Sequence, residues 1–391
     1  MSNWPLGVIS SAGGGASGFG LYSWGLNSSG ELGHGGTTRV SSPVQIGTDE
    51  DWVNAQCGMF YTIAIRNNGT LWGFGKNNVG QLGDNSTTVR SSPVQIGSDE
   101  DWLDAVLSPN QYNCSVVKAD GTLWTWGSGA FGRNGLGNTS TVCVPTQVGS
   151  ETGWADCGGH GQGGAFIKQN GTLWTVGRGH AGALANGNSA NATSNNYSTP
   201  VQVGSLTNWK FLHGKFRGMF CVKTDGTLWT WGEDDDGANG DGGGDVTRSS
   251  PIQIGSDTNW KEPFGTSGNT GGCLKTNGEL WGWGNVTGGG WANFEQGTPT
   301  TALSPDIYEN EPGGGGDTDW QGDHRIRGNT GGGNGHNGTV KSSGNKLYMW
   351  GNNEAGELGN GNTTRINSPI QISGSWYRVG TGVKHTVALK N

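Results

Sequence analysis

The stretch YTIAIRNNGTLWGFG, residues 61–75, decides the fold because it joins two short strand patterns through an Asn-Gly turn. The second strand pattern recurs six more times along the chain, and successive copies start 50 to 67 residues apart. The copies are LYSWG (21–25), LWGFG (71–75), LWTWG (123–127), LWTVG (173–177), LWTWG (228–232), LWGWG (280–284) and LYMWG (347–351). Self-similarity at this period indicates a repeat architecture built from stacked supersecondary units.

Each unit contains further elements at similar offsets. After each copy come a proline-containing strand pattern such as SPVQIG (42–47), an acidic turn, a tryptophan and a strand pattern such as YTIAIR. Four short strands in each of seven units predict an all-β, seven-bladed β-propeller with four-stranded blades. The Asn-Gly and Asp-Gly pairs predict type I′ hairpin turns, which need a positive φ at both central positions.

The two ends of the chain predict how the ring closes. HTVALKN (385–391) matches YTIAIRN and then stops, whereas the first unit begins at 21–25 without the strand that should precede it. We therefore expect the C-terminal strand to pair with the first blade, which removes exposed sheet edges. This organisation gives a flexible Gly/Ser-rich arm at 1–20 and a single propeller at 21–391, with insertions at 178–197 and 285–340.

Composition excludes several classes of protein. The chain has 391 residues with 78 Gly and 19 Trp, and this much tryptophan argues against disorder. A net charge of −8 gives no electrostatic footprint for nucleic acid, and no apolar run is long enough for a membrane helix. The six cysteines form no CxxC motif, so we expect buried thiols, with disulfides as the alternative.

The units resemble the regulator of chromosome condensation repeat family. The resemblance covers residues 21–391 and rests on GELG (30–33), GQLG (80–83), GELG (356–359) and His385-Thr386, which match the family's loop motif and strand start. It implies the propeller fold. It leaves function open, because members include a nuclear exchange factor, protein-binding inhibitors and phage virion components.

Loops sort onto two faces because neighbouring strands alternate in direction. The first face collects the long loops after the seven copies above, and the second face collects the Asn-Gly turns and the acidic turns. We expect the second face to be negative, because it gathers residues such as Asp49, Asp99 and Asp120. The first-face loops are rich in Asn, Thr, Ser and Gly and carry arginines that can bind a ligand or only stabilise their own turns. These arginines are Arg39, Arg90, Arg133, Arg248 and Arg365.

The break in the repeat at 285–340 is the main candidate for a binding loop. Trp291, Phe294 and Tyr308 are its candidate anchors, since large aromatics dominate binding energy at interfaces. The alternative is that these residues fold back to fill a gap in the sixth blade. Arg39, Arg90 and Arg365 complete the predicted binding residues.

Chemical motifs are scarce. Asp234, Asp235, Asp236 and Asp241 could supply oxygen ligands to calcium, but the spacing of a calcium-binding EF-hand loop is missing and the glycines between them belong to the repeat. The sequence contains no GxSxG, phosphate-binding or HExxH motif. We therefore expect no enzyme activity, no metal and no cofactor.

Three classes of function remain. The first is a bacteriophage virion component, such as a fibre, decoration or host-adhesion protein that binds a protein or surface glycan and is anchored to other virion proteins by the N-terminal arm. The second is a soluble bacterial protein-binding or inhibitor-type propeller, secreted or cytoplasmic. The third is an exchange factor for a small GTPase, against which the missing basic tail argues. Homo-oligomerisation, the ligand and the source stay open.

Overall fold

The computed structural model describes residues 18–103, 105–188, 195–215, 217–265, 270–284, 335–341 and 344–391. In these ranges the chain forms seven antiparallel sheets, of which five have four strands and two have three. The first blade contains β25 (Trp376–Thr381), β26 (His385–Lys390), β1 (Gly20–Gly25) and β2 (Val40–Gln45). The second contains β3 (Trp52–Cys57), β4 (Tyr61–Arg66), β5 (Leu71–Gly75) and β6 (Arg90–Gln95).

The remaining five blades follow in chain order. The third blade contains β7 (Val106–Pro109), β8 (Asn113–Val117), β9 (Leu123–Gly127) and β10 (Val142–Gln147), and the fourth contains β11 (Trp154–His160), β12 (Gly163–Lys168), β13 (Leu173–Gly177) and β14 (Tyr197–Gln202). The fifth contains β15 (Trp209–Lys215), β16 (Gly218–Lys223), β17 (Leu228–Gly232) and β18 (Arg248–Ile254). The sixth has β19 (Trp260–Gly265), β20 (Thr270–Lys275) and β21 (Leu280–Gly284), and the seventh has β22 (His336–Lys341), β23 (Lys346–Gly351) and β24 (Ile366–Ile372).

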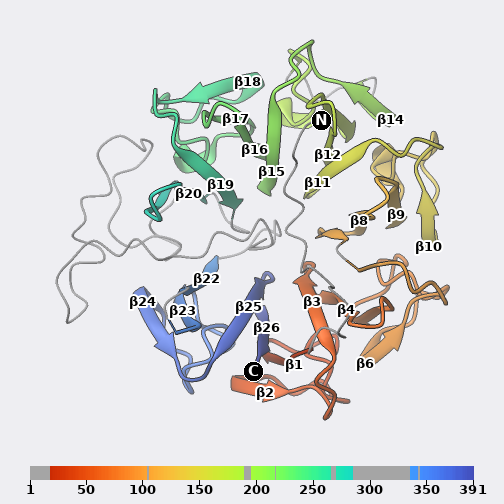
Figure 1. Ribbon diagram of the computed structural model, residues 1–391, viewed down its shortest axis with the longest axis vertical. Coiled ribbons are helices and arrows are strands. Elements are labelled where there is room, and N and C mark those ends of the chain that lie inside the picture. The colour runs from red at the N-terminus through yellow and green to blue at the C-terminus, as the bar shows by residue number, and fades with distance from the viewer. Residues whose placement is uncertain are drawn as a thin grey trace, which may run out of the picture.

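The sheets stand around a common centre, with β3, β15 and β25 towards the axis and β6, β10 and β24 at the rim (Figure 1). This arrangement confirms the predicted seven-bladed propeller. Within the described ranges, no helix is long and apolar enough to cross a membrane. Five of the six cysteines are buried in strands, and all six are free thiols.

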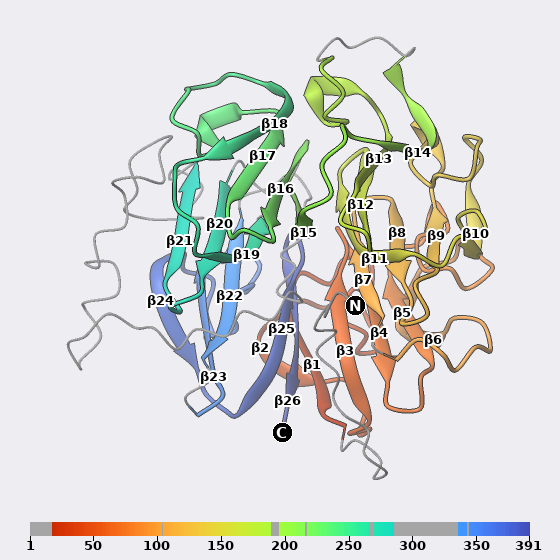
Figure 2. The same cartoon turned by 45° about the horizontal axis from the view of Figure 1, so that its top comes forward.

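The two ends of the chain share the first blade. Strand β26 lies between β25 and β1, and Leu21 pairs with Leu389 in the β1–β26 register (Figure 2). The predicted closure is therefore confirmed, and the C-terminal segment supplies two strands of this blade, where the sequence predicted one. Phe19, which the sequence assigns to the N-terminal arm, pairs with Trp52 and stacks on Tyr377 at 4.2 Å between ring centroids.

The hairpin turns differ from the sequence prediction. In the second blade the turn is closed by the backbone N–H of Gly69, which donates to Arg66 O at 3.0 Å, and only Gly69 has a positive φ. The type I′ prediction is wrong because the Asn68 side chain bonds locally instead. Its Oδ1 accepts from the Thr70 N–H at 3.1 Å and from the Thr70 hydroxyl at 2.7 Å.

The same hydroxyl continues the chain of bonds into the strand. Thr70 Oγ1 accepts from Trp72 Nε1 at 2.8 Å, and Trp124, Trp174 and Trp229 have equivalent threonine partners. In the sixth blade Glu279 takes the place of the threonine and accepts from Trp281. The repeated sequence Asn/Asp-Gly-Thr-Leu-Trp is thus a local hydrogen-bonding unit that fixes each tryptophan at the second face.

A cation lies between two aromatic rings near the second face of six blades. In the third blade the Lys118 ammonium lies 4.0 Å from the Trp102 ring centroid and 4.4 Å from that of Trp124. Lys118 also pairs with Asp101 at 2.6 Å and with Asp99 at 3.6 Å. The equivalent cations are Arg66, Lys168, Lys223, Lys275 and Lys390. Much of the acidity expected on this face is therefore neutralised within the blades.

Candidate functional site

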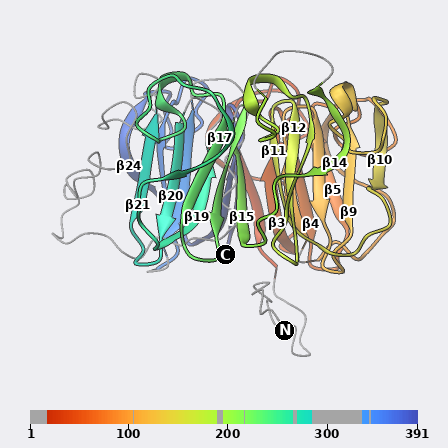
Figure 3. The same cartoon turned by 90° about the horizontal axis from the view of Figure 1, so that it is seen from above.

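The first face carries the loops in which the blades differ most. Strand direction places the long loops after β5, β9, β13 and β17 on this face, and the C-terminus lies on the opposite face (Figure 3). Three of these loops contain short 3-10 turns, which are η1 (Ala130–Gly132), η2 (His180–Gly182) and η4 (Asp235–Gly237). The loops of the first, second and seventh blades have no such turn and keep the GELG or GQLG motif.

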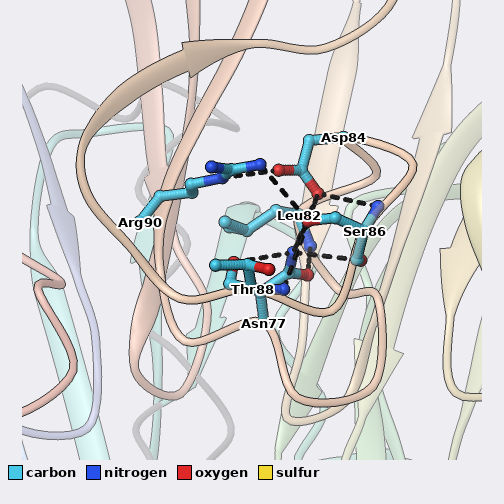
Figure 4. A network of polar contacts seen from close by, with 6 residues as sticks. All are labelled: Asn77, Leu82, Asp84, Ser86, Thr88 and Arg90. Atoms are coloured by element: carbon cyan, nitrogen blue, oxygen red, sulfur yellow. Dashed lines mark hydrogen bonds and ion pairs between the residues drawn. The ribbon is translucent and has the colours of Figure 1, made fainter.

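A buried asparagine organises each regular loop, as Figure 4 shows for the second blade. Asn77 Oδ1 accepts from the Leu82 N–H at 3.0 Å, and Asn77 Nδ2 donates to Asp84 Oδ1 at 2.8 Å. Arg90 Nε then donates to Asp84 Oδ2 at 2.8 Å. Burial alone would raise the pKa of Asp84, but hydrogen bonds from Arg90, Ser86 and Asn77 hold it below its ordinary value. Arg90 therefore stabilises its own loop.

The other predicted binding residues are dispersed. Arg39 is exposed and donates to Glu354 O at 3.4 Å, and Arg365 is exposed on the loop before β24. Trp291, Phe294 and Tyr308 lie outside the described residues, so the anchoring role assigned to them stays a prediction.

Two of the four aspartates weighed as calcium ligands, Asp234 and Asp241, have protein contacts of their own. Asp234 Oδ1 accepts from the Asn239 N–H at 2.6 Å, and Asp241 pairs with Arg248 at 2.5 Å. Asp235 lies in η4, and Asp236 follows it there. In the ranges that the structure describes, no three His, Cys, Asp or Glu side chains are grouped to hold a metal.

One loop position distinguishes the regular blades from the third. Glu31, Gln81 and Glu357 occupy this position in the first, second and seventh blades, and each accepts a loop N–H through a side-chain oxygen at 2.6–2.9 Å. Arg133 occupies it in the third blade and donates instead, from Nε to Ala130 O at 2.9 Å. An acceptor is thus replaced by a cationic donor at the same place in the fold.

Replacing Glu31 with glutamine tests the electrostatics of this position. Burial raises the pKa of Glu31, and its Oε1 has no hydrogen-bond partner. At neutral pH we expect Glu31→Gln to stabilise the protein by about 1 kcal/mol, because the charge no longer has to be buried. The gain should shrink as the pH falls below the raised pKa, where Glu31 of the folded protein takes up its proton, and vanish below the ordinary carboxyl pKa, where the acid is neutral in both folded and unfolded chains.

Chemical denaturation at neutral pH and below the ordinary carboxyl pKa of 4.5 measures this difference. The reverse change, Gln81→Glu, is the matched control and should destabilise the second blade at neutral pH. If wild type and Glu31→Gln were equally stable at neutral pH, burial of the Glu31 charge would not destabilise the protein.

The change at Arg133 is accompanied by an unusual backbone. Phe131 has a φ of 62°, a left-handed conformation that is rare for a bulky side chain. Ala181 in the fourth blade has a φ of 51° at the equivalent place. In both loops the carbonyl three residues earlier accepts from this position, Ala130 O from the Arg133 N–H and His180 O from the Ala183 N–H.

This backbone places Phe131 between two guanidinium groups. The Arg178 guanidinium lies 4.7 Å from the Phe131 ring centroid and the Arg133 guanidinium lies 5.6 Å from it. Arg133 also lies 5.2 Å from the Tyr112 ring, and Arg178 Nη1 donates to Gln162 Oε1 at 2.9 Å. Cations over aromatic faces are favourable contacts, but they do not neutralise charge.

Among the residues that the structure describes, Arg133 has no counter-charge. Its side chain is buried, with the residue only 4% exposed, and its Nη1 has no hydrogen-bond partner. Burial, together with the nearby charge of Arg178, lowers the pKa of Arg133 to about 10. An unpaired buried charge costs several kcal/mol. By contrast, Arg66, Arg90, Arg217 and Arg248 each pair with a carboxylate.

His160 adds a second unsatisfied donor beneath Arg133. The Gln162 N–H points at His160 Nδ1, at 3.5 Å, so the neutral ring carries its proton on Nε2, which has no partner. Burial and then the Arg133 charge lower the pKa of His160 to about 3, which keeps the ring neutral. Arg133 and His160 thus each carry a buried nitrogen, Nη1 and Nε2 respectively, that has no hydrogen-bond partner among the described residues.

The positive charge continues into the fifth blade. Arg217 pairs with Glu233 at 2.6 Å, and the charges of Arg217 and Arg178 add to burial in lowering the pKa of His180. We call Arg133, Arg178 and Arg217 the arginine cluster. It spans the first face of the third, fourth and fifth blades, and Arg217 is its member that pairs with a carboxylate, that of Glu233.

Sequence reasoning missed this cluster except for Arg133, which it counted among the loop arginines. A signal was available: the GQLG motif becomes GRNG (132–135), GALA (182–185) and GANG (237–240) in these three successive blades. The larger break at 285–340 was the predicted binding region instead.

Comparison with known families identifies the repeats. A family model of the regulator of chromosome condensation (RCC1) repeat matches residues 20–65, 68–107, 120–161 and 345–389. The chain carries RCC1 repeats. Each matched segment runs from one blade into the inner strands of the next, as expected for a ring closed within the first blade. The segments include Arg133 but not Arg178 or Arg217, so the arginine cluster extends beyond the matched RCC1 repeats.

Relatives and solved structures agree with this result. The E3 ubiquitin-protein ligase HERC2 of Homo sapiens is 26% identical over 232 residues, which are 57% of this chain and 5% of HERC2. The RCC2 homolog of Danio rerio is 46% identical over 54 residues, 13% of this chain and 11% of that protein. The chain thus spans only a small part of these relatives.

Two solved structures share the fold over almost their whole length. Human WBSCR16 superposes with a TM-score of 0.76 at 20% identity, covering 95% of this chain and 99% of its own. Prp20p of Saccharomyces cerevisiae gives 0.76 at 19% identity, with 96% and 92% covered. At this level of identity the likeness shows the fold alone.

Proposed function

We propose that this chain is a non-enzymatic protein-binding propeller that contacts its partner through the first face of the third to fifth blades. The observation that carries the proposal is the arginine cluster: among the residues that the structure describes, only Arg217 of its three members is shown in an ion pair, in a chain of net charge −8. Seven similar blades offer no unique site, so specificity requires a sector where the loops differ. The cluster occupies such a sector.

The relatives support a binding role by analogy. Prp20p binds Gsp1p and histones, and yeast RCC1 (Prp20) has been crystallised bound to Kap60. Those partners belong to those proteins, and a shared fold carries no function by itself. The analogy supports the class of activity, protein binding, and leaves the partner to be found.

The proposal is tested by capturing partners with charge variants of the two faces. The immobilised protein is incubated with a lysate of the cells that express it, and retained proteins are quantified by mass spectrometry. We expect a partner that is lost with Arg178→Glu and retained with Glu100→Lys, an exposed second-face residue. A partner that survives Arg178→Glu and is lost with Glu100→Lys would contradict the use of the first face, and absence of any specifically retained protein would contradict protein binding.

Attachment to a virion or host surface remains a narrower prediction within this proposal. The high Gly, Asn, Thr and Ser content motivates it, and the anchors would be Trp291, Phe294 and Tyr308. Replacing 286–314 with a short GQLG-type loop should then abolish attachment to virions or host cells with little change in melting temperature. Lower stability with attachment retained would indicate that these residues complete the sixth blade.

A further inference from the structure

We infer that the arginine cluster binds a carboxylate side chain of an acidic peptide segment, with Arg178 as the contacting group and an apolar neighbour of the acid resting on Phe131. The inference rests on the proposed function and names the chemistry of the partner. Phe131 and Arg178 are both half-buried, so each retains surface that a partner can reach.

The cluster has unused capacity for an anion. Arg178 makes one side-chain hydrogen bond, to Gln162 Oε1, and forms no ion pair within the described residues. The Arg133 guanidinium also lies near the Phe131 ring, at 5.6 Å from its centroid, and forms no ion pair among the residues that the structure describes. A carboxylate bound to Arg178 would therefore gain attraction from both guanidinium groups, in a partly desolvated place where such attraction is stronger than in water.

The size and sign of the surrounding charge favour a single carboxylate. Nucleic acid needs a track of cations that contacts several phosphates. Here the positive sector ends at the fifth blade, where Glu233, Asp234 and Asp241 follow along the same loop. Phosphate is also disfavoured, because Arg133 is covered and the partly exposed Arg217 is paired with Glu233, which leaves Arg178 as the contact group within the described part of the cluster.

Aromatic rings beside the arginines favour a peptide over a free anion. Phe131 has a strained backbone conformation and its ring lies near both Arg133 and Arg178, while the Tyr112 ring also lies near Arg133. A free carboxylate would make no use of these rings. An acidic residue next to an aliphatic or aromatic one would contact both the charge and the ring, and aromatic side chains anchor many interfaces.

Selection from a random dodecapeptide phage library against the full-length protein tests the inference. We expect the selected peptides to be enriched in Asp or Glu adjacent to an apolar residue. The best peptide, labelled with fluorescein, should bind at least about tenfold more tightly than its Asn or Gln analogue in an anisotropy titration. Arg178→Gln should remove this preference, and Arg133→Gln should weaken it. Lys76→Gln is the matched first-face control: Lys76 is a half-buried cation beside an aromatic ring in the second blade, and its loss should leave the affinity within about twofold.

Several outcomes would overturn the assignment. These are selected peptides without acidic enrichment, an acidic preference that persists in Arg178→Gln, and displacement of the peptide by inorganic phosphate or a single-stranded oligonucleotide more readily than by glutamate. Because Arg178 is half-buried, its variant is expected to fold even where Arg133→Gln does not. If these results are negative while lysate capture still depends on the first face, the carboxylate assignment fails and the protein-binding proposal stands.

Discussion

Removing residues 384–391 is expected to lower the free energy of unfolding by at least about 5 kcal/mol, a large part of the stability of a typical protein. The deletion removes β26, which lies inside the first blade and pairs with β1 on one side and β25 on the other. Val387 and Leu389 are fully buried, and burial of each such side chain contributes about 1.5–3 kcal/mol. Both neighbouring strands would also lose their hydrogen-bonding partner and become exposed edges.

Differential scanning calorimetry of the shortened chain measures this loss. A chain that lacks only the exposed Asn391 is the control and should melt close to the wild type. If the chain without 384–391 melted within a degree or two of the intact protein, the first blade would not depend on β26, and closure by the C-terminus would be refuted.

Replacing Trp126 with alanine is expected to cost about 3–5 kcal/mol, the range for deleting a large buried aromatic side chain. Trp126 is completely buried, and its Nε1 donates to Gln81 O at 2.9 Å in the loop of the second blade. The substitution therefore opens a cavity and also removes a bond between blades. Equilibrium denaturation in urea gives the difference directly.

Trp124→Ala is the matched comparison from the same strand. Trp124 is only partly buried, packs edge-to-face on Trp102 at 5.8 Å and lies under Lys118. We expect a smaller loss of about 1–3 kcal/mol, because part of the ring already contacts water. The sequence alone left open whether Trp124 is buried, and full burial would have implied a loss of about 3–5 kcal/mol. A larger effect at Trp124 than at Trp126 would contradict the burial pattern described here.

Much of the architecture could be predicted because it depends on local patterns that repeat. The Leu-Trp strands, the turn glycines and the mismatch between the two ends each require only a short window of sequence, and all three predicted the ring correctly. The prediction of type I′ turns was wrong because it considered backbone preference alone. It ignored the Asn68 side chain, whose Oδ1 accepts a hydrogen bond from the Thr70 hydroxyl. The cations between tryptophan rings were also missed, although Arg66, Lys118 and Lys168 precede each turn at a constant offset.

The candidate site was harder to predict for a physical reason. Arg133 is visible in the sequence as a departure from GQLG, but its missing counter-charge depends on what surrounds it. Tyr112, Phe131 and Arg178 come from three separate loops of two blades, and no short window contains them together. A motif search detects catalytic or metal-binding patterns of fixed spacing, whereas this site is defined by partners brought together by the ring.

Amide hydrogen exchange of the protein with and without its captured partner tests the central claim, that binding occurs on the first face of the third to fifth blades. We expect slowed exchange in the loops at 128–137, 178–187 and 233–241, because contact with a partner suppresses local opening. The second-face turns at 66–70 and 118–122 should exchange at unchanged rates. Slowed exchange confined to those second-face turns, with the three loops unaffected, would contradict the account.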